Sequence, residues 1–238
     1  CIVPPDYLMK VEKQLQQKIV DCYGGPDAAH ESFTDLQKAI NYSMTSFLTT
    51  GGIRGGNEQL GKFQPRSFNM GLSKKAFEAT GGFSTIHPGE DPDLSIRLWE
   101  LGFETALFKD AFVYHERRIS WKLFYKQVRK FGMVRVILNK WHPNTRKMTF
   151  WLPTLFVCYT ILSLILLLVG YAVFLTPVLA YMIAIAVDSW FKNGIKVGIM
   201  SVFAVILQFT SYGLGFLNSY IQIVLLNKNE REIFPNLF

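Results

Sequence analysis

The pattern of apolar and charged positions divides this chain into two parts. Residues 1–149 mix short apolar runs with charged positions and hold 21 of the 25 Lys and Arg and 15 of the 18 Asp and Glu. Residues 150–238 hold the few that remain, and no charged residue occurs from Phe150 to Val187. The first part is typical of a water-soluble domain and the second of protein that faces lipid.

Helical periodicity recurs through the first part. Leu8, Val11 and Leu15 share one face of a helix predicted from about Tyr7 to Val20, and Asp6 is a good N-cap for it. The remaining elements predicted in this part are a turn at 24–27, a helix at 33–48, an extended stretch at 63–72, a short helix between Ser73 and Gly81, a helix from Asp91 or Pro92 to Gly102, strands at 104–108 and 111–114, and a helix at 120–139 that Ser120 caps.

The uncharged run that begins at Phe150 is too long for one membrane span. A single helix over it would measure about 57 Å, whereas the hydrocarbon core of a bilayer is about 30 Å thick. We therefore predict two passes, 151–169 and 171–187, that turn near Gly170-Tyr171, and a third at 197–225. The predicted divisions of the chain are a catalytic part at 1–118, a basic helix and linker at 119–149, a membrane region at 150–226 and a tail at 227–238.

The positive charge gathers just before the first predicted span. Residues 115–149 carry ten Lys or Arg against the single acid Glu116. A basic block next to an apolar span is typical of a cytoplasmic juxtamembrane belt and does not favour a nucleic-acid surface. We therefore expect a multi-pass protein of the cell (inner) membrane, with its soluble part in the cytoplasm and its tail, after three passes, on the opposite side.

The helix predicted at 120–139 places Trp121, Phe124 and Val128 on one side and Lys122 and Lys126 elsewhere. A merely solvated charged face is one interpretation. Its position beside the membrane favours an interfacial helix that binds anionic lipid or presents a lipid-linked acceptor.

The most chemically suggestive segment is Gly89-Glu90-Asp91-Pro92-Asp93. One interpretation is ordinary helix capping, because acids are favourable at the positive end of the helix dipole. The other is a carboxylate that takes a proton from an attacking hydroxyl.

The segments around this cluster occur in a recognisable order. Phe68 to Phe83 ends in a Gly-Gly-Phe turn, Glu90-Asp91 precedes Asp93-Leu94-Ser95-Ile96-Arg97, and His115 comes later. This order over about residues 60–120 resembles the C-terminal half of the catalytic domain in family 2 glycosyltransferases of the GT-A fold. The resemblance implies an α/β fold, the C-terminal half of a Rossmann-like GT-A domain, followed by transmembrane helices.

The resemblance also implies a role for individual residues. Asp91 is expected to be the general base that deprotonates the acceptor hydroxyl, Glu90 to orient the acceptor, and His115 to reach a divalent metal on the nucleotide diphosphate. Asn69 and Gly71, with Arg66 nearby, are expected to line the donor sugar.

Two further expectations concern neighbouring residues. Asp93 and Arg97 suit a structural pair within the helix that supports Asp91. Arg54, in the glycine-rich segment Gly51–Gly56, suits a phosphate contact, although an ordinary loop is the alternative.

The implied partners are a nucleotide-sugar donor, a glycan or lipid-linked acceptor, membrane lipids and Mg or Mn. One departure from the family pattern concerns its main metal-binding motif, an Asp-x-Asp at the end of a strand just before the position of Cys1. That motif has no counterpart here, while Cys1 to Leu8 resembles what usually follows it. The expectation is a fragment that lacks the nucleotide-binding half and does not transfer sugar alone.

Two other functions remain open. One is a non-catalytic membrane-anchored scaffold that binds anionic lipid through the basic belt. The other is a metal hydrolase that uses a set of acidic and histidine side chains, namely His87, Glu90, Asp91, Asp93 and His115, although their spacing is not that of the usual zinc sites.

Overall fold

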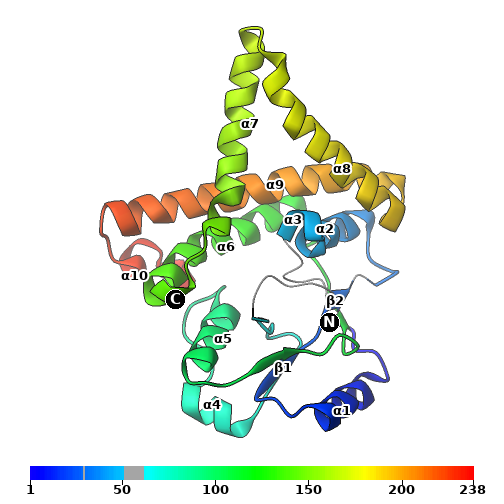
Figure 1. The fold of residues 1–238 in the computed structure, drawn as a ribbon, viewed down its shortest axis with the longest axis vertical. Helices are drawn as coiled ribbons and strands as arrows, with labels where there is room; N and C mark the ends of the chain where they lie inside the picture. The colour runs from blue at the N-terminus through cyan, green and yellow to red at the C-terminus, as the bar shows by residue number, and fades with distance from the viewer. Residues whose placement is uncertain (29, 51–61) are drawn as a thin grey trace. The chain divides into compact units, whose positions relative to one another are not determined.

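The computed structural model describes residues 1–28, 30–50 and 62–238. They form two compact units: residues 1–37 with 44–117, and residues 38–43 with 118–238 (Figure 1). The first unit is mixed α/β and the second is helical. The predicted α/β class is confirmed in this coarse form.

Two small sheets organise the first unit. In the larger one, β1 (Cys22–Gly24) is central and pairs antiparallel with β3 (Met70–Leu72) and parallel with β4 (Thr105–Leu107). In the smaller one, β2 (Asp27–Ala28) pairs in parallel with β5 (Val113–Tyr114).

The alternation of side chains along β1 builds a helical layer on each face of the larger sheet. Cys22 is fully buried against α4 (Lys74–Thr80) and α5 (Glu90–Glu100). Tyr23 points the other way, stacks on Phe108 with ring centroids 4.6 Å apart, and contacts the cluster that includes α1 (Tyr7–Gln17). Figure 1 shows these helices on the two sides of β1.

Several predicted helix ends are confirmed by their caps. Ser73 accepts a hydrogen bond from the Ala76 amide at the start of α4, and the helix ends at Gly81. Ser120 accepts in the same way from Leu123. Asp6 is the N-cap residue of α1 as predicted, but its side chain makes no capping bond and instead forms an ion pair with Lys10 (2.9 Å).

The predicted turn at 24–27 was wrong, because the chain is extended there from β1 into β2. Glycine is needed at positions 24 and 25 because other segments pack closely against the backbone there. A Cβ on Gly24 would lie 2.8 Å from the Asn69 carbonyl oxygen, and a Cβ on Gly25 would lie only 1.7 Å from the Ala111 carbonyl oxygen. The extended stretch predicted at 63–72 becomes a strand only over its last three residues.

The helix predicted at 33–48 is broken into α2 (Asp35–Thr45) and α3 (Phe47–Thr50). Ser46 lies at the break, where its hydroxyl accepts from the Leu48 amide and so starts α3. The middle of α2 belongs to the second unit, in which Tyr42 donates a 2.6 Å hydrogen bond to Asp188.

The main part of the second unit begins with α6 (Trp121–Trp141), which ends two residues later than predicted. The chain then passes through α7 (Leu152–Leu168), α8 (Thr176–Asn193) and α9 (Ile195–Ser219). Shorter helical segments complete the unit: η1 (Pro143–Thr145), η2 (Met148–Trp151), η3 (Ala172–Leu175), the π-helical η4 (Tyr220–Leu225), α10 (Glu230–Ile233) and η5 (Pro235–Leu237).

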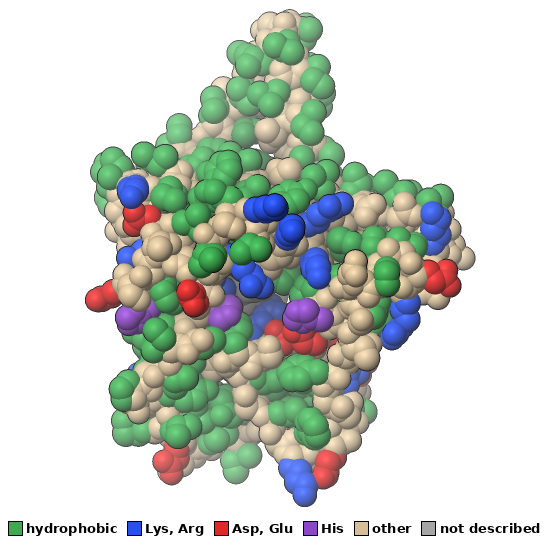
Figure 2. All heavy atoms as spheres, turned by 180° about the vertical axis from the view of Figure 1, so that it is seen from behind, with side chains coloured by type: hydrophobic (Ala, Val, Ile, Leu, Met, Phe, Trp, Pro, Cys, Tyr) green, Lys and Arg blue, Asp and Glu red, His purple; other side chains and the backbone are tan. Residues whose placement is uncertain are grey.

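Among the residues that the structure describes, three helical stretches are long and apolar enough to cross a membrane, which indicates a membrane protein: Met148–Leu168, Ala172–Asn193 and Ile195–Leu225. The predicted turn between the first two is confirmed at Gly170, whose φ of 93° suits glycine. Figure 2 shows hydrophobic side chains over the visible face of the α7–α8 hairpin, with Lys and Arg side chains gathered beneath it.

Candidate functional site

The acidic cluster forms the first turn of α5. Gly89 occupies the N-cap with φ 127°, a conformation that other residues rarely adopt. Glu90, Asp91 and Asp93 follow it directly. All three carboxylates therefore lie where the helix dipole favours a negative charge, as the capping interpretation requires. Whether one of them also has a chemical role depends on the contacts that each carboxylate makes.

Asp91 is held by a backbone donor from a distant loop. The Ser67 amide donates a 3.0 Å hydrogen bond to Asp91 Oδ1. Burial raises the pKa of the Asp91 carboxyl above its usual range and the charge of Glu90 adds to this, while Arg66 and the bond from Ser67 oppose it. A carboxylate with a raised pKa accepts a proton more readily than an ordinary aspartate, as a general base requires.

Glu90 and Arg66, the two charged neighbours of Asp91, each have a side-chain atom that could bind a ligand. Glu90 Oε1 lies 3.1 Å from His87 Nδ1. Within the described residues, Glu90 Oε2 and Arg66 Nε are buried and have no hydrogen-bond partner. Because buried polar atoms are nearly always satisfied in folded proteins, two such atoms beside Asp91 favour a polar ligand at this place.

The expected pairing of Asp93 with Arg97 is confirmed. Asp93 is 2% exposed, and Arg97 Nε and one terminal nitrogen each lie 2.9 Å from its Oδ2. Arg97 also donates to the carbonyl oxygens of Thr80 (2.6 Å) and Gly82 (2.7 Å). The pair therefore fastens the Gly-Gly-Phe turn to the helix that carries Asp91.

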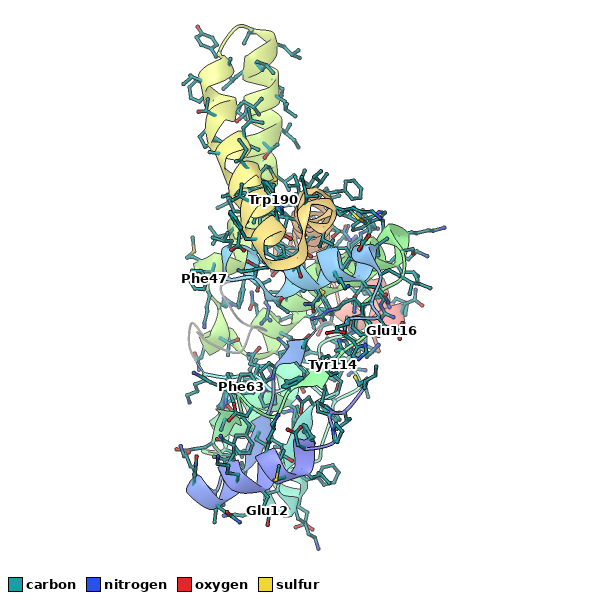
Figure 3. The ribbon with its side chains drawn as sticks, turned by 90° about the vertical axis from the view of Figure 1, so that its right-hand side faces the viewer. Glu12, Phe47, Phe63, Tyr114, Glu116 and Trp190 are labelled. Carbon is teal, nitrogen blue, oxygen red and sulfur yellow. The ribbon has the colours of Figure 1, made fainter. Side chains whose placement is uncertain are left out.

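His115 follows β5, between Tyr114 and Glu116, both labelled in Figure 3. Its ring stacks on Phe68 with centroids 4.1 Å apart. Arg117 donates to His115 Nδ1 (3.1 Å) and forms a buried ion pair with Asp27.

These contacts test whether His115 fits a metal ligand. An N–H of Arg117 donates only to an unprotonated Nδ1, so the neutral ring carries its proton on Nε2 and offers no lone pair to a metal. In the described part of the chain, no group of three or more His, Cys, Asp or Glu side chains could hold a metal ion. In this arrangement His115 therefore does not offer a ligand atom to a metal, and its role as a metal partner stays a prediction.

Asn69 and Gly71 have structural contacts in this arrangement. Asn69 is 3% exposed; its Oδ1 accepts from the Tyr7 hydroxyl (2.6 Å) and its Nδ2 donates to the Ala111 carbonyl (2.9 Å). A Cβ on Gly71 would lie 2.1 Å from the Tyr23 ring. Asn69 holds the loop that carries Arg66 and Ser67, and Gly71 leaves room for the Tyr23 ring. The predicted contact of both residues with a donor sugar stays a prediction. Arg54 lies outside the described residues.

The consecutive residues Ser67, Phe68 and Asn69 connect different parts of the predicted site. Ser67 contacts Asp91, Phe68 contacts His115, and Asn69 joins the same loop to Tyr7. Ser67 could not be predicted from the sequence, because a backbone amide is present at almost every residue type. The hydrolase interpretation is not favoured, since Asp93 forms an ion pair with Arg97.

A comparison with protein families supports the resemblance. The family model described as Glycosyl transferase family group 2 matches residues 2–188, which is more than half of the chain. No curated protein and no solved structure matches the chain significantly. With the acidic cluster at the start of α5 inside the matched range, the chain belongs to glycosyltransferase family 2.

Proposed function

We propose that the protein transfers a sugar from a nucleotide-sugar donor to a hydroxyl of a glycan or lipid-linked acceptor, with inversion at the anomeric carbon and Asp91 as general base. Asp91 accepts the proton of the acceptor hydroxyl while its oxygen attacks the anomeric carbon. The bond from that carbon to the diphosphate oxygen breaks, and the nucleoside diphosphate leaves. A single displacement of this kind needs one base and no carboxylate nucleophile.

The observation that carries this proposal is the environment of Asp91. Its carboxylate is fixed by the Ser67 amide, has a raised pKa, and lies beside the buried, partnerless Glu90 Oε2 and Arg66 Nε among the described residues. A capping role alone explains neither partnerless atom. Glu90 is then placed to accept a hydrogen bond from the acceptor, and Arg66 to attract a negatively charged donor group.

Family 2 enzymes commonly use a divalent metal. The resemblance assigns His115 to a metal that accompanies the diphosphate, but the hydrogen bond from Arg117 would first have to open. No step of the proposed transfer is therefore derived through a metal. The positions of the apolar helices and the basic residues before them support an acceptor at the membrane and a catalytic unit on the cytoplasmic side.

The test is transfer by Asp91→Asn in the full-length protein, with Asp110→Asn as the matched control on an exposed acid elsewhere in the same unit. We expect Asp91→Asn to lower the transfer rate by about 10²–10⁴-fold, the range of a lost general base. The control should retain it. Unchanged transfer by Asp91→Asn contradicts the role of Asp91 as general base, whereas absence of transfer by the unchanged protein favours the non-catalytic, lipid-binding scaffold.

A further inference from the structure

The ends of the α7–α8 hairpin contact α9 at separate places. On α8, Ser189 lies 2.7 Å from Ser201 of α9 between hydroxyl oxygens. On α7, the backbone of Thr154 lies 3.2 Å from the position of a Cβ on Gly213. Trp151, just before α7, makes an edge contact with Phe216 at 4.8 Å between ring centroids. The ends of the two legs therefore rest on different parts of one helix, and Phe209 between these places contacts both Phe156 of α7 and Tyr181 of α8.

These contacts fix the direction of α9 relative to the hairpin. Ser201 and Gly213 are about 18 Å apart along a helix at 1.5 Å per residue, whereas the two legs converge at Gly170. The helix α9 thus runs across the open end of the hairpin, a placement called the crossbar position below, and does not pack alongside the two legs as a third parallel helix (Figure 1). Figure 3, turned by 90°, shows α9 nearly along its axis near Trp190 while the hairpin stays upright.

The length of α9 agrees with this orientation. Together with η4 it forms an apolar stretch of 31 residues, Ile195–Leu225. At 1.5 Å per residue this stretch is about 46 Å long, well beyond a hydrocarbon core of about 30 Å. It is also the most buried of the three apolar stretches: 39% of its most apolar 18 residues are buried in protein, against 11% for Met148–Leu168.

The surface of α9 has two different sides. Gly215 faces α6, because a Cβ there would lie 2.1 Å from the Arg129 carbonyl oxygen, and Gly132 of α6 approaches Tyr212 equally closely (2.2 Å). The roughly opposite side of α9 and η4 carries an exposed stripe at helical spacing: Ile199, Phe203, Ile206, Leu214, Leu217, Ile221 and Val224. Every member of this stripe is apolar, which suits the acyl-chain boundary of a bilayer.

The tail after η4 returns to α6. Glu230 accepts hydrogen bonds from Lys140 (2.7 Å) and from the indole of Trp141 (2.9 Å). Burial alone would raise the pKa of Glu230, but these two donors lower it. The Asn236 carbonyl also accepts from Lys130. A tail bound to the helix that precedes the first span lies on the same side of the membrane as that helix.

We infer that the chain crosses the membrane twice, through α7 and α8, and that α9 lies in the membrane plane as an interfacial helix. Its apolar stripe meets the acyl chains, while the exposed bases of α6 meet lipid phosphates. The tail then lies on the side of α6, in place of the opposite side expected from three passes. This inference does not depend on the proposed transfer.

Sidedness of labelling tests the inference in the full chain. Cys1 and Cys158 are exposed and are replaced by Ser, whereas Cys22 is buried, and burial raises the pKa of its thiol to about 12, so it stays unreactive. Single cysteines are then introduced as Lys122→Cys on α6, Tyr171→Cys at the hairpin tip and Glu232→Cys in the tail.

A membrane-impermeant maleimide is applied to sealed vesicles of each orientation. We expect Lys122→Cys and Glu232→Cys to label from one side and Tyr171→Cys from the other. Labelling of Glu232→Cys from the same side as Tyr171→Cys overturns the inference.

Depth measurements with spin labels provide a second test that does not involve the tail. Leu155→Cys, Leu162→Cys and Val169→Cys on the hairpin should differ in depth by about 10 Å per step, because seven residues separate them. Ile199→Cys, Ile206→Cys and Leu217→Cys on α9 should report one common depth. A stepwise change along α9 like that along α7 also overturns the inference.

Discussion

The Ser67 backbone amide donates a 3.0 Å hydrogen bond to Asp91 Oδ1 and so ties the loop before β3 to the first turn of α5. The next residue, Phe68, stacks on His115. Because the donor is a backbone amide, the position of the carboxylate does not depend on the side chain at residue 67. An asparagine at position 91 retains an acceptor oxygen for this bond but loses the basic group.

The first prediction is that Asp91→Asn does not destabilise the fold. Burial raises the pKa of Asp91 in the folded state, so an ionised Asp91 lowers stability at neutral pH, above that pKa. A neutral side chain removes both the desolvation cost and the repulsion from Glu90. Thermal unfolding in detergent at pH 7 should show an unchanged or raised Tm. A lowered Tm would mean that loss of transfer reports loss of structure.

The second prediction concerns the pH dependence of transfer. A general base must be ionised, so kcat/KM falls as the pH drops through the pKa of Asp91, which burial raises above its usual range. The charge of Glu90 raises this pKa and that of Arg66 lowers it. Glu90→Gln should therefore move the acidic limb of the profile to lower pH, and Arg66→Gln to higher pH.

The opposite signs of these two shifts make the measurement specific. Glu78→Gln, on the exposed face of α4, removes one negative charge as Glu90→Gln does and serves as its control. Its acidic limb should stay in place. Shifts of equal sign for Glu90→Gln and Arg66→Gln would assign the limb to another group.

The third prediction is that Arg97→Met destabilises the first unit by about 3 kcal/mol, because it removes the ionic partner of a buried carboxylate. Arg97 is also bound to the carbonyl oxygens of Thr80 and Gly82, which lose their donor. Chemical denaturation followed by tryptophan fluorescence measures this change. The double variant Asp93→Asn/Arg97→Met should recover part of the loss, because no buried charge then remains at Asp93. No recovery would mean that the carbonyl contacts, not the ion pair, stabilise the turn.

The fourth prediction separates two roles for Asn69. Tyr7→Phe removes only the hydroxyl that donates to Asn69 Oδ1. If Asn69 supports the loop through its hydrogen bonds, stability falls by about 1 kcal/mol and the KM for the donor is unchanged. A raised KM for the donor without loss of stability would instead support direct contact between Asn69 and the donor sugar.

Features encoded by neighbouring residues were predictable from the sequence. The caps at Ser73 and Ser120, the pair Asp93 and Arg97 one helical turn apart, and the reversal near Gly170 each depend on a short segment. The placement of Asp91 in the first turn of α5 follows from the same local rules.

Features made by distant segments were not predictable. Asp27 and Arg117 are 90 residues apart and meet only in the folded state. The strand β1 was missed because its glycine resembles a turn signal, whereas it is needed for close approach to Asn69. The crossbar position of α9 depends on contacts with both hairpin legs, and its apolar composition alone matches a membrane span equally well.

The fifth prediction concerns the basic face of α6. The exposed side chains of Lys122, Lys126 and Arg129 should attract anionic lipid by about 1 kcal/mol each. Changing all three to Gln should lower the enrichment of anionic over zwitterionic lipid around the reconstituted protein by roughly 10-fold or more. Lipid exchange in mixed nanodiscs measures this enrichment, and added salt should reduce it in the unchanged protein.

The matched control changes three exposed lysines of the first unit, Lys13, Lys75 and Lys109, to Gln. Both triple variants remove the same net charge. Only charges held against the headgroups should alter lipid selectivity, since attraction to the surface falls off within a Debye length of about 8 Å. Equal losses in the two variants would show that net charge, not the position of α6, governs lipid binding, and would leave the interfacial role of α6 without support.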